Sequence, residues 1–177
     1  MTFTDAIRTC FKKYVTFSGR AARPEYWWFM LFIFLGGLVA SILDAALFGT
    51  GTVQTGPGGF AAENDSGPVS GLFSLATLLP ILSVGWRRMH DTGRSGLYLL
   101  YPILVWVGIA SFASVAGVTG QIMAGDFAAA FAGVVGLVMI VSVLIAILSP
   151  LIVIWWLTRP SQPGPNTYGP NPNEVSL

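Results

Sequence analysis

Long apolar runs, separated by short polar segments, dominate the pattern of this chain. Four of them reach the length of about 20 residues that a helix needs to cross the hydrocarbon core of a bilayer. Lipid offers no hydrogen-bond partners, so a spanning segment must satisfy its own backbone groups, as a helix does. The pattern therefore predicts an all-α membrane protein built as a four-helix transmembrane bundle. The expected spans are residues 26–48, 69–86, 97–118 and 134–157.

The composition also indicates a protein that is surrounded by lipid. Apolar residues make up 54% of the 177 positions and charged residues only 10%, whereas a soluble domain carries about 25% charged residues. With so few charges, the apolar surface needs lipid around it. The single cysteine, Cys10, has no partner within the chain for a disulfide, and we expect it to act as an inert small hydrophobe.

The basic residues are confined to three of the five segments outside the spans. None lies in the first or third loop, where the charged residues are Glu63, Asp65 and Asp126. Cytoplasmic segments carry an excess of Lys and Arg, so we expect the N-terminus, the second loop and the C-terminus to be cytoplasmic. Five of the six tryptophans fall at the same ends of the spans, where amphipathic rings suit the headgroup region. The nine basic residues are Arg8, Lys12, Lys13, Arg20, Arg23, Arg87, Arg88, Arg94 and Arg159.

The N-terminal cytoplasmic segment, residues 1–25, carries the pattern of an amphipathic helix. Apolar residues recur every four positions from Phe3 to Val15, while basic residues occupy other faces. Thr2 and Asp5 have the spacing of a capping box. We expect this helix to lie in the interface of the inner leaflet, with its basic residues near anionic headgroups. A soluble helix packed on the loops is the alternative.

The rest of the chain divides into a membrane domain, residues 26–157, and a cytoplasmic tail, residues 158–177. The tail is rich in Pro and Gly, above all from Ser161 to Pro172. Such a composition favours an extended segment without a core of its own.

Two polar clusters are expected to meet at the cytoplasmic face. One directly precedes the first span and the other forms the second loop. An arginine fork binds phosphate in a bidentate manner, and carboxylates nearby could orient such arginines through ion pairs. The competing interpretation is that these charges only set the orientation and touch headgroups. The candidate residues for binding an anion or a partner are Arg20, Arg23, Glu25, Arg87, Arg88, His90, Asp91 and Arg94.

We assign no catalytic residue, metal ligand or cofactor. His90 and Asp91 are adjacent, whereas a catalytic triad brings its members together from separate elements. One His with one or two carboxylates is short of the three or four ligands of a typical metal site. Asp44 lies within a span, but about 27 Å along the helix from Tyr26. We expect it to be a solvated helix end rather than a proton relay.

Three motifs resemble those of a known family. Residues 17–27, 87–96 and 164–172 are similar, in the same order, to the motifs of small bacterial inner-membrane proteins grouped as domain of unknown function 805. Pro24 stands where a basic residue is more usual in that family. The resemblance implies a multi-spanning inner-membrane protein without an established activity, so it transfers no catalytic residues. It also suggests that the three cytoplasmic segments belong together.

We therefore expect a non-enzymatic, multi-pass protein of the bacterial inner membrane. Its arginine-rich cytoplasmic face would bind anionic phospholipid headgroups or a membrane protein partner. The alternative is a membrane enzyme or transporter that handles a phosphorylated, anionic substrate at the inner leaflet, with His90 as acid or base. Small residues at four-residue spacing permit a homo-oligomer, and no nucleic acid is expected as a partner.

Overall fold

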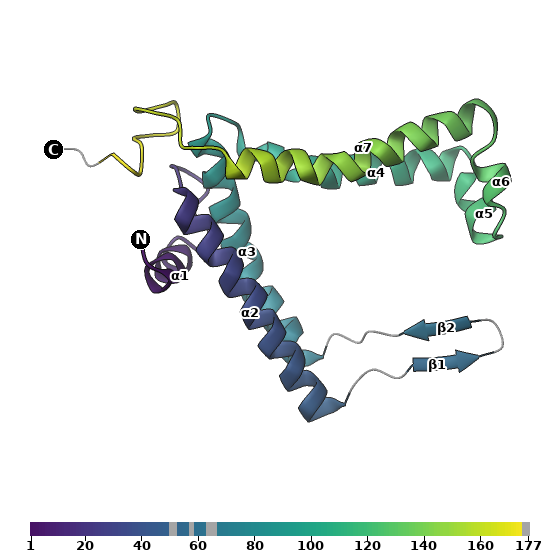
Figure 1. The fold of residues 1–177 in the computed structure, drawn as a ribbon, viewed down its shortest axis with the longest axis horizontal. Helices are drawn as coiled ribbons and strands as arrows, with labels where there is room; N and C mark the ends of the chain where they lie inside the picture. Colours follow the sequence, from purple (N-terminus) through teal and green to yellow (C-terminus); the bar gives the residue numbers. More distant parts are fainter. Residues whose placement is uncertain (50–52, 57–58, 63–66, 175–177) are drawn as a thin grey trace.

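The computed structural model describes residues 1–49, 53–56, 59–62 and 67–174. Figure 1 shows long paired helices, a short N-terminal helix and a small β-hairpin. Strands β1 (Val53–Gly56) and β2 (Gly59–Ala62) pair antiparallel, with Val53 opposite Ala62. The helices are α1 (Phe3–Lys12), α2 (Arg23–Phe48), α3 (Pro68–Asp91), the 3-10 helix η1 (Gly96–Leu100), α4 (Tyr101–Val115), α5 (Val118–Met123), α6 (Phe127–Ala130) and α7 (Gly133–Thr158).

Within the described residues, four helical segments are long and apolar enough to cross a membrane. They are α2, α3, the continuous pair of η1 and α4, and α7. Large apolar side chains on their outer faces stay exposed, such as Leu72 at 68% and Leu144 at 54%. Water solvates such a surface unfavourably, whereas lipid suits it. The all-α membrane class predicted from the sequence is confirmed, and the protein contacts the lipid bilayer.

The four long segments form two antiparallel pairs. Helix α2 packs against α3, and α4 packs against α7. Figure 1 shows that the pairs meet at one end and diverge from it, with the β-hairpin beyond the far end of one pair and α5 and α6 at the far end of the other. We call the meeting point, where α2 begins and α3 and α7 end, the arginine end.

Helix α3 continues past the end of its apolar run. The sequence predicted a span that stops at residue 86, whereas the helix extends to Asp91. Arg87, Arg88 and His90 therefore lie on the last turns of a helix rather than in a loop. Helix α2 begins at Arg23, with a proline in its first turn, where the missing N–H is no loss.

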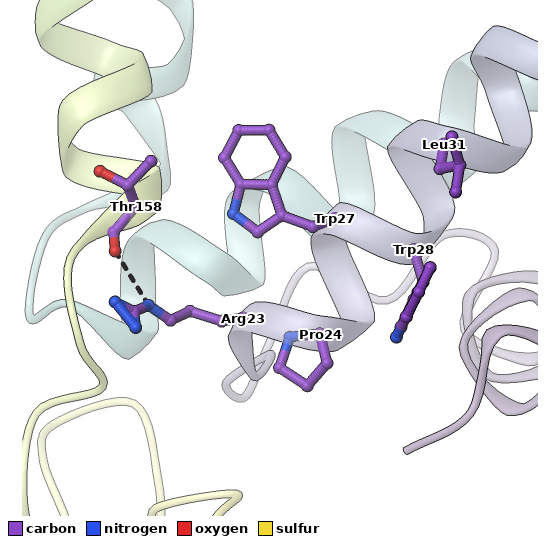
Figure 2. Close-up of a pocket in the computed structure, with 6 residues that line it drawn as sticks. All are labelled: Arg23, Pro24, Trp27, Trp28, Leu31 and Thr158. Carbon is purple, nitrogen blue, oxygen red and sulfur yellow. Dashed lines mark hydrogen bonds between the residues drawn. The ribbon is translucent and has the colours of Figure 1, made fainter.

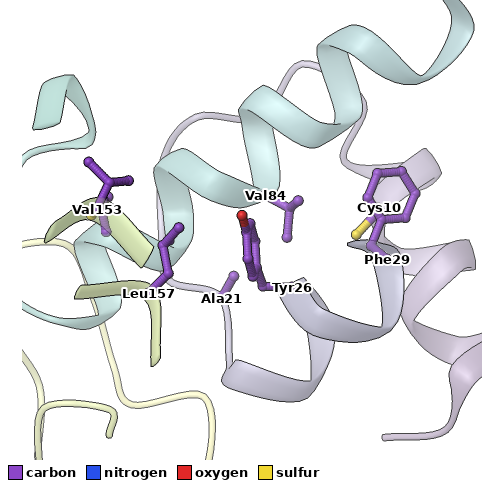
Figure 3. Close-up of a cluster of buried hydrophobic side chains, with 8 residues drawn as sticks. Cys10, Ala21, Tyr26, Phe29, Val84, Val153 and Leu157 are labelled. Carbon is purple, nitrogen blue, oxygen red and sulfur yellow. The ribbon is translucent and has the colours of Figure 1, made fainter. Parts of the chain in front are cut away.

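The main apolar cluster lies at the arginine end, beside these charges. Figure 3 shows that its side chains come from α1, α2, α3 and α7 and from the segment before α2. Phe29 and Val84 are fully buried there. A second, smaller cluster lies at the far end of the α4 and α7 pair. The members of the main cluster are Cys10, Ala21, Tyr26, Phe29, Val84, Met89, Val153 and Leu157, and those of the second are Ala113, Val118, Ala130 and Met139.

Helix α1 lies against the spans α2 and α3. Its predicted capping box is confirmed, because the Thr2 hydroxyl accepts from the Asp5 backbone N–H while the Asp5 carboxylate accepts from the Thr2 backbone N–H. Phe3 and Phe11 meet aromatic rings of α2 edge to face. Cys10 is fully buried, and burial raises the pKa of its thiol to about 12.

Asp44 is not the solvated helix end that the sequence suggested. It keeps 6% of its surface exposed, and its carboxylate accepts from the backbone N–H groups of Val69 at 2.9 Å and Ser70 at 2.8 Å. The first N–H groups of α3 have no partner within their own helix, and Gly67 at the cap position has no side chain to serve them. Asp44 of α2 caps α3 instead. Glu63 and Asp65, in the loop between α2 and α3, lie outside the described residues.

Candidate functional site

The three motif segments meet at the arginine end, with Asp91 at their centre. Asp91 is completely buried at the end of α3. One carboxylate oxygen accepts from Arg20 Nε at 2.9 Å. The other accepts from Arg88 Nη1 and from the Ser161 hydroxyl at 2.6 Å. A single carboxylate thus holds two guanidinium groups from different parts of the chain.

Arg20 links the segment before α2 to the C-terminal tail. Its Nη1 donates to the carbonyls of Gly164 at 2.8 Å and Gly169 at 3.3 Å, and its Nη2 donates to the carbonyl of Gln162 at 2.6 Å. The Arg20 guanidinium therefore donates hydrogen bonds both to the buried Asp91 carboxylate and to carbonyls of the tail. The Pro- and Gly-rich tail is therefore held against the helices as an ordered strap, which we call the C-terminal strap (residues 159–174).

Arginines also cap the end of α7. The last carbonyls of a helix have no partner within it, and here two side chains supply donors. Arg88 Nε donates to Leu157 O at 3.0 Å and its Nη2 to Arg159 O. Arg23 Nε donates to Thr158 O at 2.9 Å. These bonds fix the end of one helix pair to the other pair.

Arg87 forms a separate buried ion pair with Glu25. The distance from Arg87 Nη1 to Glu25 Oε1 is 2.5 Å, and the two side chains are 1% and 5% exposed. Among the described residues, Arg87 Nε and Nη2 have no hydrogen-bond partner. The Arg87 carbonyl accepts from the backbone N–H of Ala21. This ion pair joins α2 to α3.

His90 contacts the strap and the segment before α2. Its Nδ1 lies 3.1 Å from the carbonyl oxygen of Gly19, and because a carbonyl only accepts, Nδ1 carries the proton. The imidazole stacks on the Tyr168 ring at 3.8 Å between centroids and 5° between planes. The Asn166 amide donates to the His90 carbonyl at 3.0 Å. His90 thus serves as a platform for the strap.

Arg94 and Arg159 have different surroundings. The Arg94 guanidinium lies 5.1 Å above the Trp156 ring and that of Arg159 lies 4.9 Å above the Trp155 ring. Both line a cleft of about 310 Å³, together with hydroxyl and amide side chains of the loop and strap. Burial, and after it the positive charge of Arg159, lowers the pKa of Arg94. Among the residues that the structure describes, no carboxylate lines this cleft.

The arginines at this end therefore divide into two groups. Among the described residues, the ion pairs within 4.0 Å are the three that involve Arg20, Arg87 and Arg88. The buried arginine core is Arg20, Arg87 and Arg88 with Glu25 and Asp91. The arginine rim is Arg23, Arg94 and Arg159.

Sequence analysis named most of the residues at the arginine end as candidates, but it did not name all of them. Arg159 was counted for orientation only, and Ser161 and Tyr168 were not considered as site residues. The resemblance of the tail to a family motif was the one signal that the strap belongs with the other segments. Clefts of about 570 Å³ and 310 Å³ open at this end, and His90, Asp91 and Glu25 line neither. Within the described residues, no three His, Cys, Asp or Glu side chains are grouped to hold a metal ion.

Four apolar spans joined at one end by buried arginines define a multi-pass α-helical membrane protein. The chain belongs to the family described as "Protein of unknown function (DUF805)", whose model matches residues 14–170. This range contains the first two motifs and the third as far as Pro170.

Two relatives come from Escherichia coli (strain K12). They are the inner membrane proteins YhaI and YhaH, each 34% identical to this chain over 113 residues. The matches cover 62% of this chain and 83% and 84% of the two relatives. No solved structure matches the chain.

Proposed function

We propose that this chain is a non-enzymatic, multi-pass protein of the bacterial inner membrane whose arginine end faces the cytoplasm and binds anionic phospholipid headgroups. The location follows that of the relatives YhaI and YhaH, which are inner membrane proteins. The orientation follows the absence of Lys and Arg from the first and third loops.

The observation that carries the proposal is the arginine rim. Arg94 and Arg159 line one cleft without a carboxylate beside them, and their faces are covered by tryptophan rings. Arg94 Nη1 donates to the Thr92 carbonyl at 3.2 Å, and a guanidinium stacked on an indole can direct its remaining N–H groups to an anion. The positive charges of Arg94 and Arg159 repel each other, and a phosphate bound between them would relieve that repulsion.

A lipid fits these surroundings better than a protein partner does. The rim lies at the ends of spanning helices, and Trp155 is 54% exposed there, as expected for a side chain at headgroup depth. Each basic residue near an anionic membrane surface contributes about 1 kcal/mol of attraction.

The orientation is tested first. A reporter that is active only in the cytoplasm, fused after Leu177, should be active. An inactive fusion, with a periplasmic reporter active at the same position, would overturn the proposed orientation.

Lipid binding is tested by electron paramagnetic resonance of spin-labelled lipids around the full chain in bilayers. The wild type should restrict labelled phosphatidylglycerol more than labelled phosphatidylcholine. The double substitution Arg94→Gln/Arg159→Gln should lower this preference at least about fivefold. Arg8→Gln/Lys12→Gln is the matched control, because it removes two charges from α1, outside the cleft.

Two outcomes would overturn the proposal. One is a wild type without a preference for the anionic lipid. The other is an equal loss in the control pair, which would show that only net charge acts. A protein that co-purifies stoichiometrically with the wild type and is lost in the cleft variant, without any lipid preference, would identify a protein partner instead.

A further inference from the structure

A groove lies where the start of α2 passes the end of α7. Its volume is about 570 Å³, and it is lined by five residues of the first turns of α2 and by Thr158 of α7. Figure 2 shows Arg23 and Trp27 projecting from α2 toward Thr158. We infer that this groove holds one molecule of an anionic phospholipid, with its phosphate on Arg23 and an acyl chain along Trp27 and Leu31. The inference rests on the proposed function and adds a defined site to it.

The charged end of the groove has an arginine that is fixed in place. Arg23 Nε donates to Thr158 O at 2.9 Å, which orients the planar guanidinium. Among the described residues, its two terminal nitrogens make no hydrogen bond and no carboxylate lies within 4.0 Å. Two N–H groups in a fixed fork match two oxygens of a phosphodiester. The rim arginine thus supplies the headgroup contact.

The rest of the groove is apolar and follows the direction of a lipid. Trp27, Trp28 and Leu31 remain 40%, 39% and 38% exposed. Leu31 lies eight residues beyond Arg23, which is about 12 Å further along the helix. The wall therefore runs from the charged end toward the middle of the bilayer, as an acyl chain does below its phosphate. A volume of this size suits a ligand with a substantial apolar part and far exceeds what a phosphate ion fills.

The position of the groove explains why one lipid would stay longer than its neighbours. A lipid on a single helix face has one wall, whereas this site combines α2 with the end of α7. The two helices belong to different pairs. The bound lipid would contact both pairs next to their meeting point.

The test counts lipids on the full chain in mild detergent by native mass spectrometry. Titration with phosphatidylglycerol should give one retained molecule per wild-type chain, and phosphatidylcholine should give none at the same concentration. Arg23→Gln should weaken retention about tenfold, because it removes the charged hydrogen bonds to phosphate. Trp27→Ala should weaken it several-fold through lost apolar contact. Free glycerol 3-phosphate should not displace the lipid.

Matched controls lie elsewhere on the same protein. Arg8→Gln removes an exposed charge from α1, and Trp106→Ala removes a 55% exposed tryptophan from α4. Both should retain the lipid as the wild type does. Equal loss in a control and in its groove variant would overturn the site.

The outcomes also separate this inference from the proposed function. Retention that survives Arg23→Gln but is lost in Arg94→Gln/Arg159→Gln would overturn the groove site and place the lipid in the cleft. Retention lost only in the groove variants, with Arg94→Gln/Arg159→Gln unchanged both here and in the bilayer measurement, would support the groove site and overturn the proposed role of the Arg94 and Arg159 cleft. Displacement by glycerol 3-phosphate would show an anion site without a lipid and overturn the inference.

Discussion

Arginines at the same end of the molecule have two different environments. Those of the core are buried in ion pairs, and those of the rim line open clefts. In the core, three guanidinium groups share two carboxylates and the carbonyls of α7 and the strap. In the rim, the guanidinium groups lie on tryptophans or on a helix end and face open clefts. The positive-inside rule counts both groups alike. The comparison teaches that a count of charges does not distinguish arginines buried in ion pairs from arginines that line an open cleft.

The largest expected effect comes from removing the acid that the core shares. Asp91→Asn leaves Arg20 and Arg88 buried without their carboxylate, and breaking a buried ion pair in this way costs about 3–5 kcal/mol. Thermal unfolding of the purified protein in detergent should show a large drop in the melting temperature. Asp126→Asn is the control, because Asp126 is exposed and only caps the short helix α6. Equal melting temperatures for the two variants would contradict a structural role of the core.

The sequence predicted the class of the protein and its four long apolar helices, because each such helix is a local property of about 20 consecutive residues. The capping box of α1 is local in the same sense, with Thr2 and Asp5 three positions apart. The family resemblance predicted in addition that the three motif segments lie together. No pattern within a single segment indicates this.

The division between core and rim could not be predicted, because it depends on long-range contacts with backbone groups. Arg20 and Arg88 bind carbonyls more than 65 positions away, and a carbonyl has no signature in the sequence. Helix α3 extends beyond the predicted span for a related reason. Charges usually mark the end of an apolar span, but here Arg87 and Arg88 are paired with buried carboxylates and the helix continues past them to Asp91.

A smaller effect is expected from a change that keeps the charge of the core. Arg20→Lys preserves the count of basic residues and therefore the orientation, but an ammonium cannot reproduce the fork that reaches Asp91 and the strap together. We expect a loss of about 1.5–3 kcal/mol in the docking of the strap. A spin label on Thr167→Cys should report increased mobility. Cys10 should not react in parallel, because it is buried and the pKa of its thiol is about 12.

The corresponding rim substitution sharpens the contrast. Arg23→Lys also keeps the charge, and Arg23 makes no bond to the strap. The label on residue 167 should then be as immobile as in the wild type. Equal mobility in the Arg20 and Arg23 variants would show that the strap is held by charge alone, and the distinction between core and rim would fail.

The smallest effect is expected at the outer edge of the strap, where Glu174 accepts from the Gly164 N–H at 2.9 Å and from the Asn171 amide at 2.7 Å. These bonds lower the pKa of Glu174 below its usual 4.5, the one from Gly164 most. A lowered pKa means that the bonds stabilise the strap fully above about pH 4.5 and that this stabilisation is lost as the pH falls through the folded value. The same label on residue 167 should gain mobility only in acid, and Glu174→Gln should remove the pH dependence. A pH response that persists in Glu174→Gln would assign it to another group, and a strap that detaches completely in acid would mean that the core itself titrates there.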